Sequence, residues 1–390
     1  MGNMLDYLRW RGDLTFEQDP FNDADAVLLS RLSYLQLDGI VGSGYDETVT
    51  LREAARLFSE DMEKVKNILW KGDDELLSLV GESERFGNCL VSCYVNVIED
   101  DIQMQFAAMI VKLGDGLRYV GFRGTDNTLT GWQEDFNMFC TFPVPAHISA
   151  LQYLEFAAEH FDGEFIVGGH SKGGNLAVFS SSFCKPELQQ RIRRVYNMDG
   201  PGFDSSAMSA SNFENIKDRI LTLVPQTSIF GMMFEHEESY TVVKSDEKGF
   251  LQHDVYSWEI IRNGLNELST TTTASMFIDR TFSDFVKSLT NEERKEFTEA
   301  VFNILKTTDD TTFSGIMENW FKDSAVIFKS IKKLDPETRN VLLGTLSALA
   351  HCARSNFADL SPINTTPLRF RGFKIPEKRK RAITLRKKQA

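Results

Sequence analysis

The spacing of apolar residues divides the chain into four stretches. Residues 1–80 place apolar side chains largely at helical spacing and predict an N-terminal helical lead-in. Residues 81–260 alternate short apolar strands with turns and then with helices, which predicts an α/β core. Residues 261–360 return to the helical period and predict a C-terminal helical region. A Pro/Thr-rich linker and a basic tail are expected over residues 361–390.

The core pattern indicates two kinds of strand connection. Its first apolar stretches are separated by acidic and glycine turns, as in an antiparallel meander. From about residue 147, buried strands alternate with helices, which favours a largely parallel sheet with helices on both faces. Sites in such sheets lie at the carboxyl ends of the strands. The predicted strands are 89–98, 102–113, 117–122, 164–169, 195–198, 220–224 and 240–243.

Helices are predicted on either side of these strands, and residues 1–22 are expected to be an extended lead-in. The predicted N-terminal helices are one that is capped by residues 22–25 and runs to residue 35, then 51–70 and 73–80. The predicted helices of the core and the C-terminal region are 148–161, 173–183, 258–266, 274–289, 292–305, 316–331 and 336–351.

A G-x-S-x-G motif, residues 169–173 (GHSKG), lies between a predicted strand and a predicted helix. In a sharp strand-to-helix turn the central serine is held in a strained backbone conformation with its hydroxyl exposed. The two glycines let strand and helix come close, and the helix N-terminus directs free N–H groups at an anion formed there. Ser171 is therefore predicted as a nucleophile, and a glycine-rich turn with an incidental serine is the alternative.

A serine nucleophile needs a base and a carboxylate that orients the base. His253 follows the last predicted strand, where the base lies in hydrolases with the chain order Ser, Asp, His. Asp199 directly follows the strand at 195–198 and precedes a Gly-Pro-Gly turn, so its carboxylate is predicted at the sheet edge beside the serine. A structural histidine and an Asx-turn are the alternatives. Asp204 and Asp254 are lesser candidates for the acid.

Acyl transfer also needs N–H donors aimed at the developing oxyanion. The first predicted donor is the N–H of Lys172. The second is expected from the loop after the strand at 117–122, at Gly124 and Thr125, with the Thr125 hydroxyl adding to it. Arg123 is then expected to brace this loop by pairing with Asp126 or Asp135.

Two further expectations concern the surroundings of the site. Residues 229–234 (IFGMMF) form either a pliable apolar cover over the pocket or part of the core. No metal or cofactor is predicted, because acidic residues and histidines are scattered without ligand spacing and residues 168–173 lack the Walker spacing.

Charge is unevenly spread along the chain. The net charge is −13, but residues 369–390 hold ten Lys/Arg and one Glu, so the rest of the chain carries −22. A body this acidic is a poor nucleic-acid binder. The tail is predicted to be solvated and disordered, and weak contact with an anionic membrane surface or with nucleic acid is the alternative.

Cysteine usage and hydropathy bear on the compartment. Five scattered cysteines form neither a metal-ligand spacing nor a disulfide framework and predict reduced thiols. No apolar run approaches the length of a membrane span, and no secretory signal is visible. A cytoplasmic protein is expected.

Four segments resemble a known family: residues 7–13 (YLRWRGD), 122–125 (FRGT), 169–175 (GHSKGGN) and 199–203 (DGPGF). Together they look like the bacterial Mbeg1-like family (the DUF2974 group), which is similar to class 3 lipases. The resemblance covers roughly residues 1–260 and implies the α/β-hydrolase fold with a serine-hydrolase site. In class 3 lipases the acid usually follows the next strand, where this chain has Ser228 and no carboxylate. This departure favours Asp199 as the acid, or else a weakened triad.

These features predict a serine hydrolase that cleaves carboxylic esters of lipids or other small molecules through an acyl-enzyme on Ser171. The departure at Ser228 motivates an alternative, a catalytically silent hydrolase fold that binds a partner through its C-terminal helical region. An acyltransferase or thioesterase on the same triad is the third hypothesis, since pocket shape selects the acceptor. The sequence predicts no particular oligomeric state.

Overall fold

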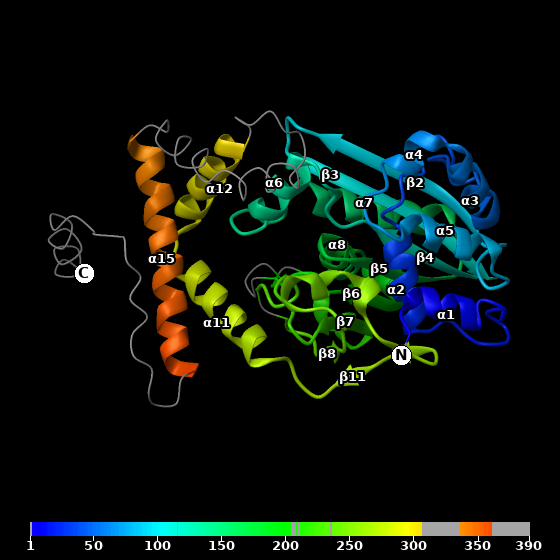
Figure 1. The fold of residues 1–390 in the computed structure, drawn as a ribbon. Helices are drawn as coiled ribbons and strands as arrows, with labels where there is room; N and C mark the ends of the chain where they lie inside the picture. Colours follow the sequence, from blue (N-terminus) through cyan, green and yellow to red (C-terminus); the bar gives the residue numbers. More distant parts are fainter. Residues whose placement is uncertain are drawn as a thin grey trace, which may run out of the picture.

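The computed structural model describes residues 2–114, 116–203, 208–209, 211–234, 236–305 and 336–360. Within them, nine strands form one sheet in the order β1-β2-β3-β4-β5-β6-β7-β8-β11 (Figure 1). Neighbours in the sheet are therefore also successive strands of the chain, apart from the step to β11. The strands are β1 (Val49–Thr50), β2 (Leu90–Glu99), β3 (Met104–Gly114), β4 (Leu117–Phe122), β5 (Glu164–His170), β6 (Ile192–Met198), β7 (Ile220–Pro225), β8 (Tyr240–Val243) and β11 (Glu267–Leu268).

The sheet joins an antiparallel part to a parallel part at β4. The strands from β1 to β4 pair antiparallel, and those from β4 to β8 pair parallel. β11 closes the far edge by pairing antiparallel with β8. The predicted meander followed by a parallel sheet is confirmed, and all seven predicted strands are present. β5, the strand that leads to the G-x-S-x-G motif, is the middle strand of the sheet.

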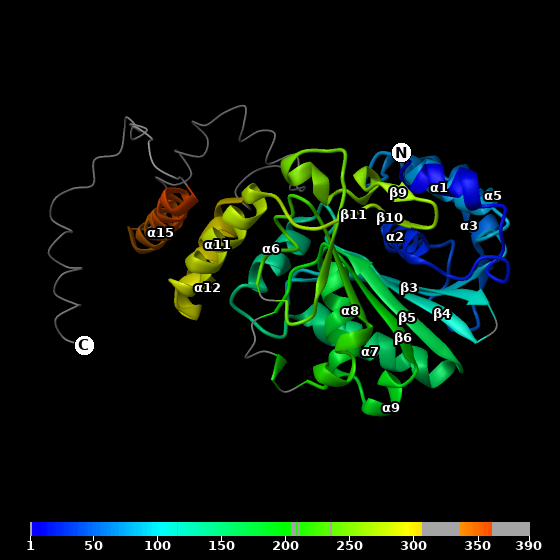
Figure 2. The same cartoon turned by 90° about the horizontal axis from the view of Figure 1, so that it is seen from below.

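Helices cover both faces of this sheet (Figure 2). Neighbouring residues of β5 show why: Ile166 packs into the core of one face and Val167 into that of the other, because successive strand residues point to opposite faces. The α/β-hydrolase-like fold is therefore confirmed. The first face carries α1 (Met4–Arg11), α2 (Asp23–Leu32), α3 (Leu51–Glu60) and α5 (Asp73–Glu82), and the second carries α7 (Pro145–His160) and α8 (Lys172–Phe183).

The N-terminal residues differ from the prediction of an extended lead-in, which is wrong. The Asn3 side chain accepts the N–H groups of Leu5 and Asp6, and the Asp6 carboxylate accepts the N–H of Asn3. This capping box starts α1, whose buried side chains add to the core on the first face of the sheet. The predicted helix over 51–70 is also interrupted, because Asp61 ends α3 and caps the short α4 (Met62–Lys66).

The predicted helix over 258–266 is wrong as well. Trp258 is fully buried and its Nε1 donates to the carbonyl of Gln252 at 2.9 Å. The chain then turns at Arg262, whose φ is 61°, into a hairpin of β9 (Ile260–Ile261) and β10 (Gly264–Leu265). A left-handed residue cannot continue a right-handed helix, so burial of the tryptophan overrides the local spacing.

The C-terminal region contains α11 (Thr273–Lys287), α12 (Asn291–Leu305) and α15 (Pro336–Leu360). Phe302 and Leu305 of α12 pack on Leu129, Trp132 and Phe136 of α6 (Leu129–Asn137), so this region contacts the core through α6. The predicted helix 316–331, the linker 361–367 and the basic tail lie outside the described residues.

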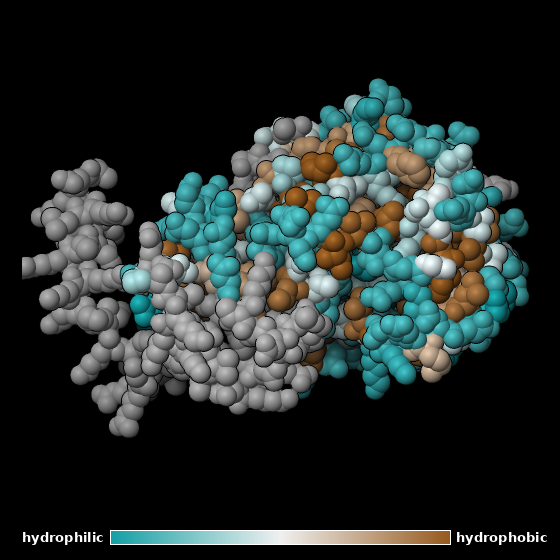
Figure 3. All heavy atoms as spheres, turned by 90° about the horizontal axis from the view of Figure 1, so that it is seen from above, coloured by the Kyte–Doolittle hydropathy of each residue, from teal (hydrophilic) through white to brown (hydrophobic). Residues whose placement is uncertain are grey.

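The surface in the space-filling view of Figure 3 mixes hydrophobic patches with hydrophilic residues. The large apolar side chains with the most exposure include Phe250, Met62 and Trp10. Among the described helices, none combines the length and the apolar character that crossing a membrane requires.

Candidate active site

Ser171 lies at the sharp turn between β5 and α8. Its φ is 58° and its ψ is −131°, a region that residues with a side chain rarely occupy. Its N–H donates to the carbonyl of Met198 at 2.8 Å, which fixes the turn on β6. A Cβ at Gly169 or at Gly173 would lie 2.5 Å or 2.2 Å from the carbonyl oxygen of Phe122, so both positions require glycine. This is the geometry of a nucleophile elbow.

Asp199 and His253 are hydrogen-bonded to each other. Asp199 directly follows β6, has a φ of 50° and is fully buried. Its Oδ2 lies 2.7 Å from Nδ1 of His253. Because a carboxylate oxygen accepts and does not donate, Nδ1 carries the hydrogen and Nε2 is left as the basic nitrogen. The hydrogen bond between the two residues has the arrangement that the acid and the base of a triad require.

The His253 ring lies against the elbow. Its centroid is 4.4 Å from that of His170, the residue before Ser171, and 4.4 Å from that of Phe230. Among the residues that the structure describes, the Ser171 hydroxyl makes no hydrogen bond, either to His253 or to another group. The structure therefore brings the three side chains to one edge of the sheet without closing the bond from serine to base.

His170 holds the backbone of His253. A carbonyl only accepts, so the 2.8 Å contact from His170 Nε2 to the carbonyl of His253 requires a hydrogen on Nε2. Nδ1 is then the acceptor for the hydroxyl of Tyr34 at 2.9 Å. Burial, together with the neighbouring His253, holds the pKa of His170 well below its ordinary value and keeps this ring neutral. Sequence reasoning missed both roles, because no spacing links residue 34 to residue 170.

Ser228 lies in contact with Asp199, the predicted acid. Its buried hydroxyl donates to Oδ1 of Asp199 at 2.5 Å, the oxygen that His253 does not use. The position where class 3 lipases usually carry the acid thus supplies a hydrogen-bond donor to the Asp199 carboxylate. Asp254, a lesser candidate, instead accepts the N–H of Tyr256 at 3.1 Å, and Asp204 lies outside the described residues.

The loop after β4 approaches the elbow closely. A Cβ at Gly124 would lie 2.5 Å from the carbonyl oxygen of His170 and 2.0 Å from the hydroxyl of Tyr34, so a side chain does not fit there. The Thr125 hydroxyl donates to Oδ2 of Asp135. Its hydrogen is therefore engaged, and the expectation that this hydroxyl adds to the oxyanion donors is wrong in this arrangement. The backbone N–H groups of Gly124 and Thr125 remain the candidates.

Arg123 braces the same loop. It is buried and its Nη2 donates to Asp126 at 3.2 Å and to Asn96 at 2.8 Å. Of the two expected partners, the structure thus pairs Arg123 with Asp126. Asp135 instead holds Thr125, and burial raises the pKa of the Asp135 carboxyl to about 6.

The family model called Mbeg1-like matches residues 80–303, which contain the elbow, the Asp199–His253 bond and the loop after β4. The chain belongs to the Mbeg1-like family. No curated protein sequence matches it. Solved structures similar to it include one titled "Crystal structure of M37 lipase", with 16% identity over 53% of this chain and 68% of that chain and a TM-score of 0.32.

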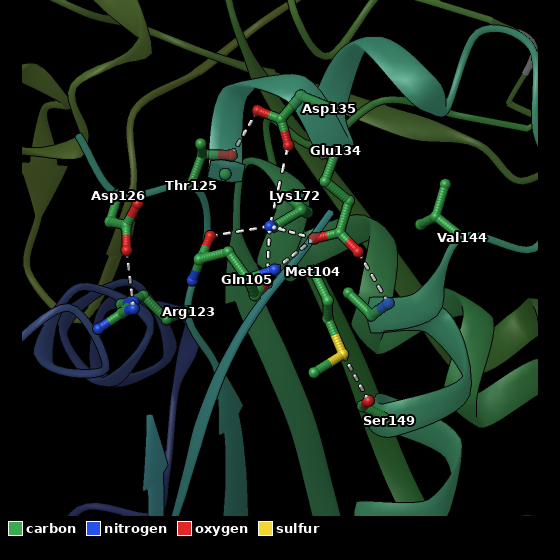
Figure 4. Close-up of polar contacts among 12 residues, drawn as sticks. Met104, Gln105, Arg123, Thr125, Asp126, Glu134, Asp135, Val144, Ser149 and Lys172 are labelled. Carbon is green, nitrogen blue, oxygen red and sulfur yellow. Dashed lines mark hydrogen bonds and ion pairs between the residues drawn. The ribbon is translucent and has the colours of Figure 1, made fainter. Parts of the chain in front are cut away.

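The side chain of Lys172 lies in a buried polar cluster of this Mbeg1-like chain (Figure 4). Its Nζ donates to the carbonyl and to Oε1 of Gln105, each at 2.8 Å, and to Oε2 of Glu134 at 2.9 Å. The N–H of the same residue is the first of α8 and has no partner among the described residues, as an oxyanion donor requires.

Two other histidines of the Mbeg1-like chain are engaged away from Ser171. His147 Nε2 lies 2.7 Å from Oδ1 of Asn175, and burial lowers the pKa of His147 to about 4. His236 is paired with Glu238 at 2.9 Å. Within the described ranges, no group of three or more His, Cys, Asp and Glu side chains could hold a metal ion.

A cavity of about 370 Å³ reaches α8 at Asn175, four residues after Ser171. It lies between the start of α8, the turn after Asp199 and the segment between α6 and α7. Phe234, from the predicted cover, stacks on Phe139 with ring centroids 5.2 Å apart. The lining is rich in aromatic and sulfur-bearing side chains: Met138, Phe139, Cys140, Thr141, Phe142, His147, Asn175, Gly202, Phe203, Phe234, Asn291 and Arg294.

Proposed function

We propose that this protein is a serine hydrolase that cleaves carboxylic esters through an acyl-enzyme on Ser171. The observation that carries the proposal is the 2.7 Å bond between Asp199 and His253, made by a ring that packs against the residue before the elbow serine. It supplies an oriented base, and the strained turn at Ser171 presents the nucleophile.

In the proposed reaction, Nε2 of His253 takes the proton of the Ser171 hydroxyl as the oxygen attacks the ester carbonyl carbon. The N–H of Lys172 and those of Gly124 and Thr125 donate to the oxyanion. The C–O bond to the leaving alcohol then breaks, and His253 returns the proton to that alcohol. Water attacks the acyl-enzyme by the same route and releases the acid.

Asp199 has a defined electrostatic role in this scheme. Its buried carboxylate stabilises the imidazolium that His253 becomes in the transition state. The hydroxyl of Ser228 donates to the second carboxylate oxygen and keeps the group oriented and solvated in the interior.

The four phenylalanines of the cavity at Asn175 support a substrate with an apolar acyl group. The rings of Phe139, Phe142, Phe203 and Phe234 and the thioether of Met138 offer contacts to a hydrocarbon chain, and the polar lining residues Thr141, Asn175, Asn291 and Arg294 leave room for a polar part of the same substrate. Acyl lipids and other apolar esters of small molecules are therefore the proposed substrate class. The enzyme would meet these substrates in solution or at the surface of a membrane.

Fluorophosphonate labelling tests this proposal directly. The wild-type protein should be labelled on one serine and Ser171→Ala should take no label, whereas the variant Ser59→Ala on the surface of α3 should be labelled like the wild type. A series of p-nitrophenyl esters of increasing acyl length then measures kcat/KM. Absence of labelling in the wild type, or equal labelling of Ser171→Ala, would refute the hydrolase.

A binding protein with a silent hydrolase fold is the second candidate, favoured by the Ser171 hydroxyl that makes no hydrogen bond among the described residues. It predicts no turnover of any short-chain ester and no effect of Ser171→Ala on partner capture. An acyltransferase or thioesterase would keep the labelling and differ in product, so acyl transfer to added alcohols and hydrolysis of thioesters distinguish it.

A further inference from the structure

We propose that the buried ion pair between Lys172 and Glu134 is a positioning device that holds the N–H of Lys172 on the oxyanion. The inference rests on the proposed hydrolase function, and it assigns to α6 a part in that function. Lys172 is the residue after the nucleophile, so its backbone faces the reacting carbonyl while its side chain runs into the interior.

All three hydrogens of the Lys172 ammonium group have acceptors in the interior. An ammonium group has three hydrogens, and its Nζ has three acceptors at 2.8–2.9 Å, namely the carbonyl and side chain of Gln105 on β3 and the carboxylate of Glu134 on α6 (Figure 4). Because the side chain is held at its far end, rotation of the Lys172 peptide unit is opposed.

Glu134 connects four elements around the oxyanion position. Its Oε2 accepts the N–H of Gln105 at 3.0 Å as well as Lys172, and its Oε1 accepts the N–H of Ala146 at 2.9 Å. Ala146 is in the first turn of α7, where a carboxylate is favoured by the free N–H groups. Glu134 therefore fixes β3, α6, α7 and the first residue of α8 relative to one another.

The second oxyanion element is attached to the same helix. Asp135, the next residue of α6, accepts the hydroxyl of Thr125 and lies 4.0 Å from Nζ of Lys172. One helix therefore sets the distance between the two groups of N–H donors, one on the loop after β4 and one at the start of α8. A shift of α6 would change both donors together.

Energetics support a positioning role over a stabilising one. Removing two ions from water costs free energy, and in many cases a well-packed apolar pair in the same place stabilises the fold equally well or better. A buried ion pair is therefore weak evidence for stability. Here both side chains are 1% exposed or less. What the ions do supply is a single geometry, because three donors and their acceptors are matched in number and direction.

A double variant separates the two roles. Lys172→Met alone leaves the Glu134 carboxylate buried without its cation, whereas Lys172→Met/Glu134→Gln removes both charges. We expect the double variant to unfold at a higher urea concentration than the single variant, with an unchanged KM and a kcat that is lower than wild type by about 100-fold, the usual cost of a donor displaced by about 1 Å. Recovery of kcat together with stability would overturn the proposal.

Amide hydrogen exchange gives a readout that does not depend on activity. In the double variant, exchange should accelerate over residues 122–126 and 170–175 relative to the rest of the sheet. The matched control is the equally buried pair of Arg85 and Asp25, and Arg85→Met/Asp25→Asn should leave exchange at both segments and kcat unchanged. Unchanged exchange in the Lys172/Glu134 variant refutes the positioning role. Accelerated exchange in that variant, combined with a wild-type protein that fluorophosphonate does not label, refutes only the hydrolase.

Discussion

The two sides of Ser171 are supported in different ways. On the side of the proposed base, His253 is held by the Asp199 carboxylate and by the neutral ring of His170, and the neutral hydroxyl of Ser228 donates to Asp199. On the side of the oxyanion, Lys172 is held by a buried carboxylate. The base side thus contains one buried charge, on Asp199, and the oxyanion side contains a cluster of charges on Lys172 and α6.

This difference predicts different sensitivities. Neutral hydrogen bonds depend on geometry and are worth about 0.5–1.5 kcal/mol each, so loss of one that does not involve Asp199 should reduce activity moderately. Buried charges respond to protonation and to loss of a partner, so changes on the oxyanion side should alter stability and pH dependence as well. The following variants test this contrast.

The largest effect is expected from Asp199→Asn. An asparagine amide can donate to Nδ1 of His253 and so favours the tautomer in which Nε2 carries the hydrogen and cannot act as a base. A triad with this change loses about 10⁴-fold in kcat. Ester hydrolysis measures it, and Asp254→Asn, which changes a nearby carboxyl outside the triad, is the control. Retention of more than a tenth of the activity would remove Asp199 from the role of acid.

The next largest effect is a dependence of the free energy of unfolding on pH, which arises from Asp135. Burial raises the pKa of its carboxyl from the ordinary 3.8 to about 6, so the folded protein holds this proton more tightly than the unfolded chain. The stability that the group contributes is therefore fully present below pH 3.8 and is lost as the pH rises through 6. At about 1.4 kcal/mol per pKa unit, the loss is at most about 3 kcal/mol.

Asp135→Asn should remove this dependence. Urea unfolding between pH 4 and 7 should show the free energy of unfolding of the wild type falling relative to that of the variant as the pH rises. Asp13→Asn, at an exposed carboxyl, should track the wild type. Parallel curves for wild type and Asp135→Asn would contradict the assignment of a charge-sensitive oxyanion side.

Ser228→Ala is expected to have a smaller effect, on activity. It removes one donor to the Asp199 carboxylate, and a hydrogen bond to a charged group is worth about 1.5–3 kcal/mol, or about 10- to 100-fold in kcat. Ser275→Ala is the matched control, because Ser275 donates to the carbonyl of Ser228 and does not touch Asp199. Equal kcat for the two variants would mean that the second carboxylate oxygen needs no donor.

How much of this could be predicted from sequence differs between the two sides. The sheet, the elbow and the pairing of Asp199 with His253 follow from residues that come after β5, β6 and β8, because strand order and chain order coincide over these strands. Glu134 has no such signal. It lies on α6, a helix that is not among those predicted from the sequence, and its partners come from β3, α7 and α8.

The same reason explains the errors in the fold. The hairpin at 258–266 depends on the core that receives Trp258, and the contact of His170 with Tyr34 depends on α2 lying over β5. Both are tertiary contacts between segments with no local pattern in common. Asn3 is the exception, because its capping box with Asp6 is a local signal that was visible in the sequence.

Tyr34→Phe has the smallest expected effect, yet it tests the contrast most closely. The Tyr34 hydroxyl lies between the two sides: it donates to Nδ1 of His170, and a Cβ on Gly124 would lie 2.0 Å from it. Loss of one neutral hydrogen bond on the base side predicts a reduction of about 3- to 10-fold in kcat. Tyr94→Phe is the control. It removes a hydroxyl of similar burial that donates to the carbonyl of Leu35 at 3.3 Å, and it should leave kcat unchanged.

If Tyr34→Phe instead lowers activity by about 100-fold or more, the loop at Gly124 has moved as well. The hydroxyl then couples base and oxyanion, and the two sides cannot be treated as independent.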